Sequence, residues 1–277
     1  MPINVRAAGL ALAISVSSVS LAFAQSSLNE VLTRHGVTVR GGIAAAFDAH
    51  VTPAIPVTPG ALTMPMATIT ANTGRDQIAG AYAFAILAGR SGRAASAQEL
   101  AAVGQVLVRM IGSEDRNSRV AGTRVAGRLF AAPYDQSGVR PVLPAGLVDG
   151  LFAVLNRDAE IDQLAAMDAL GLLRERSAVS SMTDRYYFYR EQNKRALAGA
   201  ALEAIARIGD VSAAAIVRQA AADEFASGKD ATALAVAFAR ERVLKDGSIG
   251  VIQRALEERS RRDQARGYLA ELGAPVP

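Results

Sequence analysis

The sequence contains no cysteine and no tryptophan, and it has only two histidines among its 277 residues. Without cysteine, the chain has no means of forming a disulfide bond, a cysteine–zinc site or a thiol nucleophile. A lipid anchor attached through cysteine is excluded for the same reason. His35 and His50 are weak candidates for metal binding or acid–base catalysis, because both fall in the proline-rich region described below.

The sequence also lacks the motifs of common catalytic and nucleotide-binding sites. It has no phosphate loop, no His-Glu-x-x-His pair, no Gly-x-Ser-x-Gly turn and no spaced cluster of metal ligands. Carboxylates are adjacent at Glu114-Asp115 and Glu257-Glu258, but neighbouring residues of a helix point about 100° apart. We expect these carboxylates to be surface charges and helix caps. The sequence therefore predicts no catalytic residue, no cofactor and no metal, and a protein that is not an enzyme.

Aromatic residues make up only 5% of the chain, although 51% of it is hydrophobic. Alanine supplies much of the hydrophobic fraction. This composition suits the close packing of helices better than a β-sandwich, which would use β-branched and aromatic residues. The composition predicts an all-α fold.

The positive charge of the chain is small and dispersed, with a formal net charge of +4 and a pI near 9.7. One group of arginines near the C-terminus is interrupted by acidic residues. The group consists of Arg259, Arg261, Arg262 and Arg266, with Glu257, Glu258 and Asp263 among them. Nucleic-acid binding usually needs a coherent basic face, so we expect no nucleic-acid partner. A structural role at an anionic envelope surface is a further alternative.

Residues 1–24 have the pattern of a secretory signal peptide. Arg6 is their only charge, an apolar stretch follows it, and Ala22-Phe23-Ala24 resembles a cleavage site before Gln25. The alternative is an uncleaved membrane anchor, but serines interrupt the stretch and it barely reaches spanning length. We expect an exported protein, periplasmic or extracellular, with no stable membrane insertion after cleavage.

Residues 25–72 are expected to form a proline-rich N-terminal arm with one or two short helices. Four prolines, at positions 53, 56, 59 and 65, alternate there with threonines. Because proline lacks a backbone donor and fixes its own φ, this density predicts an extended segment. The segment would lie along the first helices as a cap or act as a linker.

Residues 73–277 show the 3.6-residue apolar period of packed amphipathic helices. Helical pairs are expected at residues 78–111, 120–155, 158–191, 193–225 and 231–256, with a last helix at 263–272. No helix of this kind can bury its apolar stripe alone, so each needs neighbours on both sides. This requirement predicts an α-solenoid, in which successive pairs stack on one another.

Cap residues support several of the expected helix ends. Ser96 and Glu99 have the spacing of a capping box, in which each side chain binds the other's free backbone donor. Asn193 is a predicted N-cap, and Gly209 fits the left-handed position that ends a helix. Asp210 is then expected to cap the helix that follows.

Two phrases of this region resemble known repeats. Met167-Asp168-Ala169-Leu170-Gly171 and the run from Ala201 to Asp210 are similar to the Ala-Leu-Gly-x-Ile-Gly-Asp phrase of HEAT repeats. They resemble especially the short bacterial type also found in phycobilin lyase-like proteins. The resemblance covers roughly residues 75–273 and implies a solenoid whose second helices line a concave, protein-binding face. It identifies no catalytic residues.

The segment from Arg185 to Arg190 holds four of the chain's fourteen aromatic residues. Tyr186 and Tyr189 continue an apolar stripe and are predicted to be core residues. Exposed aromatics beside arginine are typical of protein-binding surfaces. The candidate binding residues are Tyr187, Phe188, Arg190 and, from the second helix of the next pair, Arg218. The alternative is that these residues pack against the neighbouring repeat.

The sequence therefore predicts a non-catalytic, exported scaffold or adaptor that binds a protein or peptide through the concave face of a HEAT-like solenoid. The alternative function is that of a lyase-like or chromophore-binding HEAT protein. That alternative would require a concave pocket with converging polar groups.

Overall fold

Every part of the chain that the structure describes is helix, turn or loop. The computed structural model describes residues 27–49, 57–91, 95–132, 140–223, 225 and 231–275, and these contain no strand. The prediction of an all-α fold is therefore confirmed. The predicted signal peptide and His50 lie outside the described residues. Within the described ranges, no helix combines the length and apolar character needed to cross a bilayer.

The chain divides into two compact units, residues 1–125 and 126–277, and each is described by itself. The first unit contains a helix at residues 27–34, α2 (Ile43–Asp48), the 3₁₀ turn η1 (Pro59–Leu62), α3 (Thr63–Ala71), α4 (Gly74–Ser91), α5 (Ala97–Ile111) and the larger part of α6 (Arg116–Leu129). The boundary expected at residue 73 stays a prediction.

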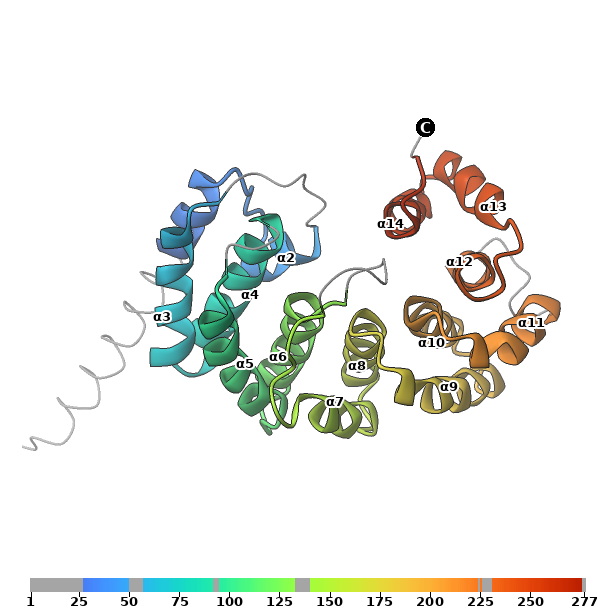
Figure 1. The fold of residues 1–277 in the computed structure, drawn as a ribbon, viewed down its shortest axis with the longest axis horizontal. Coiled ribbons are helices and arrows are strands. Elements are labelled where there is room, and N and C mark those ends of the chain that lie inside the picture. The colour runs from blue at the N-terminus through green and yellow to red at the C-terminus, as the bar shows by residue number, and fades with distance from the viewer. Residues whose placement is uncertain are drawn as a thin grey trace, which may run out of the picture. The chain divides into compact units, whose positions relative to one another are not determined.

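Helix α4 lies at the centre of the first unit. Both α2 and α3 pack against it, as Figure 1 shows. All seven residues from Ala81 to Leu87 are buried. A helix that is apolar around its whole circumference has to be covered on every side. The chain N-terminal to α4 provides part of that cover, and the ring of Phe47 on α2 lies 4.8 Å from that of Tyr82.

The extended segment predicted at the prolines is wrong for residues 59–71. Pro59 begins η1, and Pro65 stands in the first turn of α3. Proline is tolerated there because the first backbone N–H groups of a helix have no partner within it. The number of prolines does not indicate which of them stand at the start of a helix. Pro53 and Pro56 lie outside the described residues.

The capping box predicted at the start of α5 is confirmed. The Glu99 amide donates to the Ser96 hydroxyl over 3.2 Å, and the Ser96 amide donates to the Glu99 carboxylate over 2.7 Å. Each side chain thus satisfies a donor that the helix leaves free.

The described part of the second unit consists mainly of short helices. In chain order they are α7 (Leu147–Leu155), α8 (Glu160–Leu172), η2 (Arg176–Ala178), α9 (Val179–Glu191), α10 (Arg195–Ile208), η3 (Val211–Ala213), α11 (Ala214–Ala222), α12 (Ala231–Ala239), the π-helical turn η5 (Arg240–Leu244), α13 (Ile249–Arg254), η6 (Ala255–Glu257) and α14 (Arg262–Leu272).

The turns around α10 confirm two of the three predicted caps. Gly209 ends α10 with φ +66°, in the left-handed region that favours glycine. The Asp210 carboxylate accepts from the Ser212 amide over 2.8 Å and opens the next helical turn. The predicted N-cap role of Asn193 is wrong. Asn193 has φ +55° and turns the chain after α9, so that Lys194 precedes the helix without a side-chain cap.

Helices α8, α10 and α12 of the second unit form one row, with α10 packed against both of the others. Helices α7, α9 and α11 pack against α8, α10 and α12, respectively. Figure 1 shows these helices in chain order from yellow-green to orange. Most of these contacts join helices that are adjacent in sequence or separated by one helix. The last helix, α14, packs against α12 and α13.

Glycine lets neighbouring helices approach each other closely. A Cβ atom added at Gly171 of α8 would lie 2.9 Å from the Cα atom of Ala204 on α10. One added at Gly127, near the end of α6, would lie 2.7 Å from the Cα atom of Ala169 on α8. These helices meet backbone to backbone. This is the small-residue packing that the alanine-rich composition predicts.

Candidate functional site

The binding residues predicted from the aromatic segment lie on α9 and α11, and two of them join these helices. The Tyr187 hydroxyl donates to the side-chain oxygen of Gln219 over 2.5 Å. The Arg190 guanidinium forms an ion pair with Asp223. A shallow, open depression is lined by Arg190, Gln219, Ala222 and Asp223. For Tyr187 and Arg190, the structure therefore shows contacts between neighbouring helices.

Phe188 and Arg218 are exposed, with 45% of the Phe188 surface accessible to solvent. The Phe188 ring meets the ring of Tyr189 edge-on, with 5.5 Å between the centroids. These two residues are the part of the predicted binding set that remains available to a partner.

Tyr186 and Tyr189 are fully buried, as predicted. The Tyr189 hydroxyl donates to the side-chain oxygen of Gln163 over 2.7 Å. Among the described residues, the Tyr186 hydroxyl has no hydrogen-bond partner of good geometry. Burial, followed by the neighbouring carboxylate of Asp223, raises the pKa of Tyr186 to about 12. Both tyrosines are thus core residues, and Tyr186 stays protonated at neutral pH.

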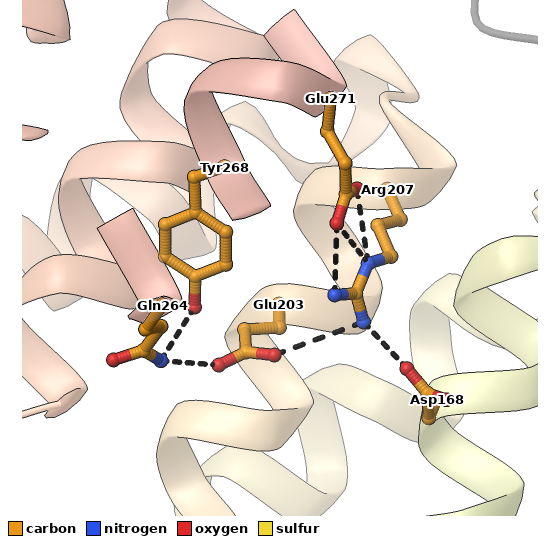
Figure 2. Close-up of polar contacts among 6 residues, drawn as sticks. All are labelled: Asp168, Glu203, Arg207, Gln264, Tyr268 and Glu271. Carbon is orange, nitrogen blue, oxygen red and sulfur yellow. Dashed lines mark hydrogen bonds and ion pairs between the residues drawn. The ribbon is translucent and has the colours of Figure 1, made fainter. Parts of the chain in front are cut away.

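A larger polar cluster joins three helices of the second unit, and sequence analysis did not predict it. Figure 2 shows its six residues converging from α8, α10 and α14. They are Asp168 on α8, Glu203 and Arg207 on α10, and Gln264, Tyr268 and Glu271 on α14. The α10 pair is four residues apart, and the α14 residues follow at steps of four and three. Each helix therefore presents its members on one face.

Arg207 is the centre of this cluster. Its Nη1 atom lies 2.7 Å from Asp168 Oδ1 and 3.7 Å from Glu203 Oε2. Its Nε and Nη2 atoms bind the Glu271 carboxylate in a bidentate arrangement, with closest contacts of 3.1 and 3.0 Å. The Arg207 side chain is 13% exposed. Burial alone would lower the pKa of Arg207, but the three carboxylates outweigh it and raise that pKa, so Arg207 remains charged.

Glu203 occupies a less favourable position for charge. Burial raises the pKa of its carboxyl group above the ordinary value, although Arg207 and hydrogen bonds from Tyr268 and Gln264 oppose the change. The Gln264 amide donates to Glu203 over 2.8 Å. The side chain keeps 22% of its surface exposed. The Glu203 carboxyl group is thus accessible to solvent, although protein surrounds most of it. Burial and the Glu203 charge raise the pKa of Tyr268 well above its ordinary range.

The cluster joins α14 to α10, and through Arg207 to α8. Its residues also have few of the properties of an acid–base pair. The Tyr268 ring stacks on Phe238 of α12, with centroids 4.2 Å apart and planes 6° from parallel. A permanently charged arginine is a poor acid or base at neutral pH. Within the described ranges, no group of three or more histidines and carboxylates is placed to hold a metal ion. Three carboxylates around one guanidinium leave a formal charge of −2 if all are ionised.

An uncovered surface lies beside this cluster, on α8 and the first half of α10. We call it the α8/α10 face: Ile161, Leu164 and Asp168 of α8, with Ala196 and Ala200 of α10. Ile161 is 52% and Leu164 38% exposed, and the Asp168 side chain is 34% exposed. Ala196 is exposed and Ala200 half-buried. Two large apolar side chains are thus partly exposed here, on the same helix as the Asp168 carboxylate.

Sequence reasoning missed both features for an identifiable reason. The spacing of Glu203 and Arg207 is visible in the sequence, but their partners on α14 stand 61 to 64 residues away. Ile161 and Leu164 have the 3.6-residue period that is typical of core positions, so the pattern does not reveal that they are exposed. His35, the described histidine, is in a turn after the helix at residues 27–34 and is not part of the cluster.

Comparison of the chain with protein-family models, curated proteins and solved structures finds no match.

Proposed function

We propose that the protein is a non-catalytic, exported scaffold that binds a segment of another protein through the α8/α10 face of a HEAT-like helical solenoid. The paired helices of the second unit and the two HEAT-like phrases support this architecture. The pattern of residues 1–24 supports export. The binding surface differs from the aromatic set predicted on α9 and α11.

The observation that carries the proposal is the seating of α14. This helix lies against α10 and α12 through one aromatic stack, an arginine–carboxylate pair and an amide–carboxylate hydrogen bond. The row thus already accommodates one helix on the side where Glu203 and Arg207 project (Figure 2). The adjacent apolar residues Ile161 and Leu164 are left uncovered. A second helical segment would bury them in the same manner.

The chromophore-binding alternative has no specific observation in its favour. It requires a concave pocket with converging polar groups. Within the described chain, the depression at Arg190 and Asp223 is shallow and open. The α8/α10 face is likewise a surface and suits a macromolecular partner.

Crosslinked capture of the mature protein from the envelope fraction tests the proposal. The double variant Ile161→Asp/Leu164→Asp changes the α8/α10 face, whereas Phe188→Ala/Arg218→Ala changes the surface predicted from sequence. We expect mass spectrometry to identify a partner that is enriched with the wild type, lost with the first variant and retained with the second. Circular dichroism checks that both variants are folded.

Capture of the same partner by the Ile161→Asp/Leu164→Asp variant would refute the assignment of the face. Loss of the partner only in the Phe188→Ala/Arg218→Ala variant would return the binding surface to α9 and α11. No partner with any folded form would contradict the scaffold function itself.

A further inference from the structure

We propose that the partner of the α8/α10 face is an amphipathic helix whose apolar side is bordered by arginine or lysine. This inference rests on the proposed function and specifies the chemistry of the partner. It follows from the spacing of the exposed residues on α8, from the unused bonding capacity of Asp168 and from the way in which α14 is bound.

Ile161, Leu164 and Asp168 form a continuous stripe along α8. Their spacing of three and four residues places them on one face of the helix, over about two turns. The residues between them are buried, including Ala165, Ala166 and Met167. Two apolar side chains followed by a carboxylate match a partner helix with apolar residues on one turn and a polar residue on the next.

Asp168 retains acceptor capacity for such a partner. Within the described part of the chain its carboxylate bonds only to Arg207, and only through Oδ1. An ionised carboxylate has about four lone-pair sites, so several acceptor positions remain. The side chain is about one-third exposed, which makes those positions accessible from solvent.

The surrounding charge selects a cationic donor. Arg207 is the one cation in the cluster of Figure 2, and it is shared among Asp168, Glu203 and Glu271. If all three carboxylates are ionised, the cluster's formal charge of −2 would repel an acidic segment and attract a basic one. Arginine would add a planar donor pair that fits a carboxylate.

The binding of α14 shows how a helix on this row meets its charges. Glu271 of α14 forms an ion pair with Arg207, and the Gln264 amide donates a hydrogen bond to Glu203. The apolar contact beside them is the stack of Tyr268 on Phe238. A helix placed next along the row would meet Asp168 with a donor and Ile161 and Leu164 with its apolar side.

Fluorescence anisotropy with three labelled synthetic peptides tests this chemistry on the mature protein. The first is an amphipathic helical peptide with leucines on one side and arginine at the border; the second carries glutamate in place of arginine. The third has the composition of the first in a scrambled order. We expect the arginine peptide to bind at least about tenfold more tightly than either of the others, because only it matches both the apolar stripe and the charge.

Protein variants locate the contact. Asp168→Asn keeps an oxygen that can accept from Arg207 but removes the negative charge. We expect it to weaken binding of the arginine peptide about three- to tenfold and to reduce the salt dependence of binding. The matched control is Asp184→Asn, which removes an exposed carboxylate on α9 and should change neither property. Ile161→Asp/Leu164→Asp should abolish binding.

Each contrary result has a distinct meaning. Equal binding of the glutamate peptide, equal binding of the scrambled peptide, or an unchanged affinity of Asp168→Asn would overturn the inference. If a captured partner depends on Ile161 and Leu164 while no arginine peptide binds, the inference fails and the scaffold function stands. If neither capture nor peptides show binding to the folded protein, both fail.

Discussion

At the scale of single residues, Arg207 decides how three helices meet. Of the six residues in Figure 2, Arg207 is the one cation, and it lies between Asp168, Glu203 and Glu271. Removing a partner from a buried ion pair is more costly than the pair is worth, because the remaining charge stays desolvated. The carboxylates here keep 21–34% of their surfaces exposed, which moderates that cost.

We predict that Arg207→Met lowers the free energy of unfolding by about 2–3 kcal/mol, below the roughly 3–5 kcal/mol of a fully buried pair. Methionine keeps most of the aliphatic volume, so the loss reports on charge. Urea denaturation measures it. The control is Arg176→Met, which removes an arginine that is 70% exposed and paired with Asp210. We expect the control to cost less than about 1 kcal/mol. Equal costs would contradict the central role of Arg207.

Glu203 gives the protein a pH dependence of stability. Its pKa is raised in the folded state above the ordinary 4.5, so the folded protein holds this proton more tightly than the unfolded chain. Its stabilising contribution is complete below pH 4.5 and declines as the pH rises through the folded pKa. Asp210, Asp223 and Asp246 have lowered pKa values, so the stability that they add is lost below 3.8, outside this window.

The variant Glu203→Gln resembles the protonated side chain at every pH. We predict that, relative to the wild type, its stability increases progressively as the pH rises above about 4.5. Thermal unfolding of both proteins between pH 4 and pH 8 measures the difference. A constant difference over that range would show that burial does not affect the Glu203 titration.

At the scale of helices, glycine positions decide which elements can be adjacent. Gly171 allows the backbones of α8 and α10 to come close together, while a Cβ atom added at Gly250 of α13 would have open space around it. Both stand in helices, where alanine is intrinsically preferred over glycine by roughly 1 kcal/mol. The same substitution should therefore have opposite effects at the two positions.

We predict that Gly171→Ala destabilises the protein by about 1–3 kcal/mol, because its Cβ would lie 2.9 Å from the Ala204 backbone. We predict that Gly250→Ala is neutral or stabilises by up to about 1 kcal/mol. The midpoints of urea unfolding measure both. Similar effects of the two substitutions would mean that α8 and α10 are not in close contact.

Sequence patterns predicted the local features of these elements and missed the long-range ones. The capping box of Ser96 and Glu99 and the turn at Gly209 depend on residues within a few positions, and both are confirmed. The helix at Pro65 was missed because proline is compatible with a helix only in its first turn, and the number of prolines does not show where a helix begins. The cluster of Arg207 was missed because α14 returns to α10 from more than sixty residues along the chain. Periodicity shows that a face is apolar and does not show which element covers it.

The candidate site illustrates the same limit. Tyr187 and Phe188 were selected for their chemistry, and only the helix positions of α9 and α11 reveal that Tyr187 bonds to Gln219. Ile161 and Leu164 have the spacing of core residues, yet they are exposed because nothing in the described chain is seated on that part of α8. Which apolar stripe is left without a neighbour depends on how many helices the chain supplies.

At the scale of the whole molecule, the signal-peptide pattern of residues 1–24 predicts where the protein is found. We predict that the protein accumulates in the periplasm or medium of the expressing bacterium and that its N-terminal residue is Gln25. Intact-mass measurement and N-terminal sequencing of the exported form test this. Replacing Ala22 and Ala24 with bulky residues should block cleavage and leave the protein attached to the membrane. A cytoplasmic full-length protein would contradict export.

The backbone-to-backbone contact of Gly171 with Ala204 has a consequence for the stiffness of the row. Glycine and alanine have no rotamers to exchange, so this seam cannot yield by repacking its side chains. Bending would have to pull the two backbones apart. The α8–α10 pair is therefore expected to move as one rigid unit, with bending confined to the turns beside it. A ligand helix would then bind a preformed surface, and differences in affinity between ligands would lie mainly in their dissociation rates.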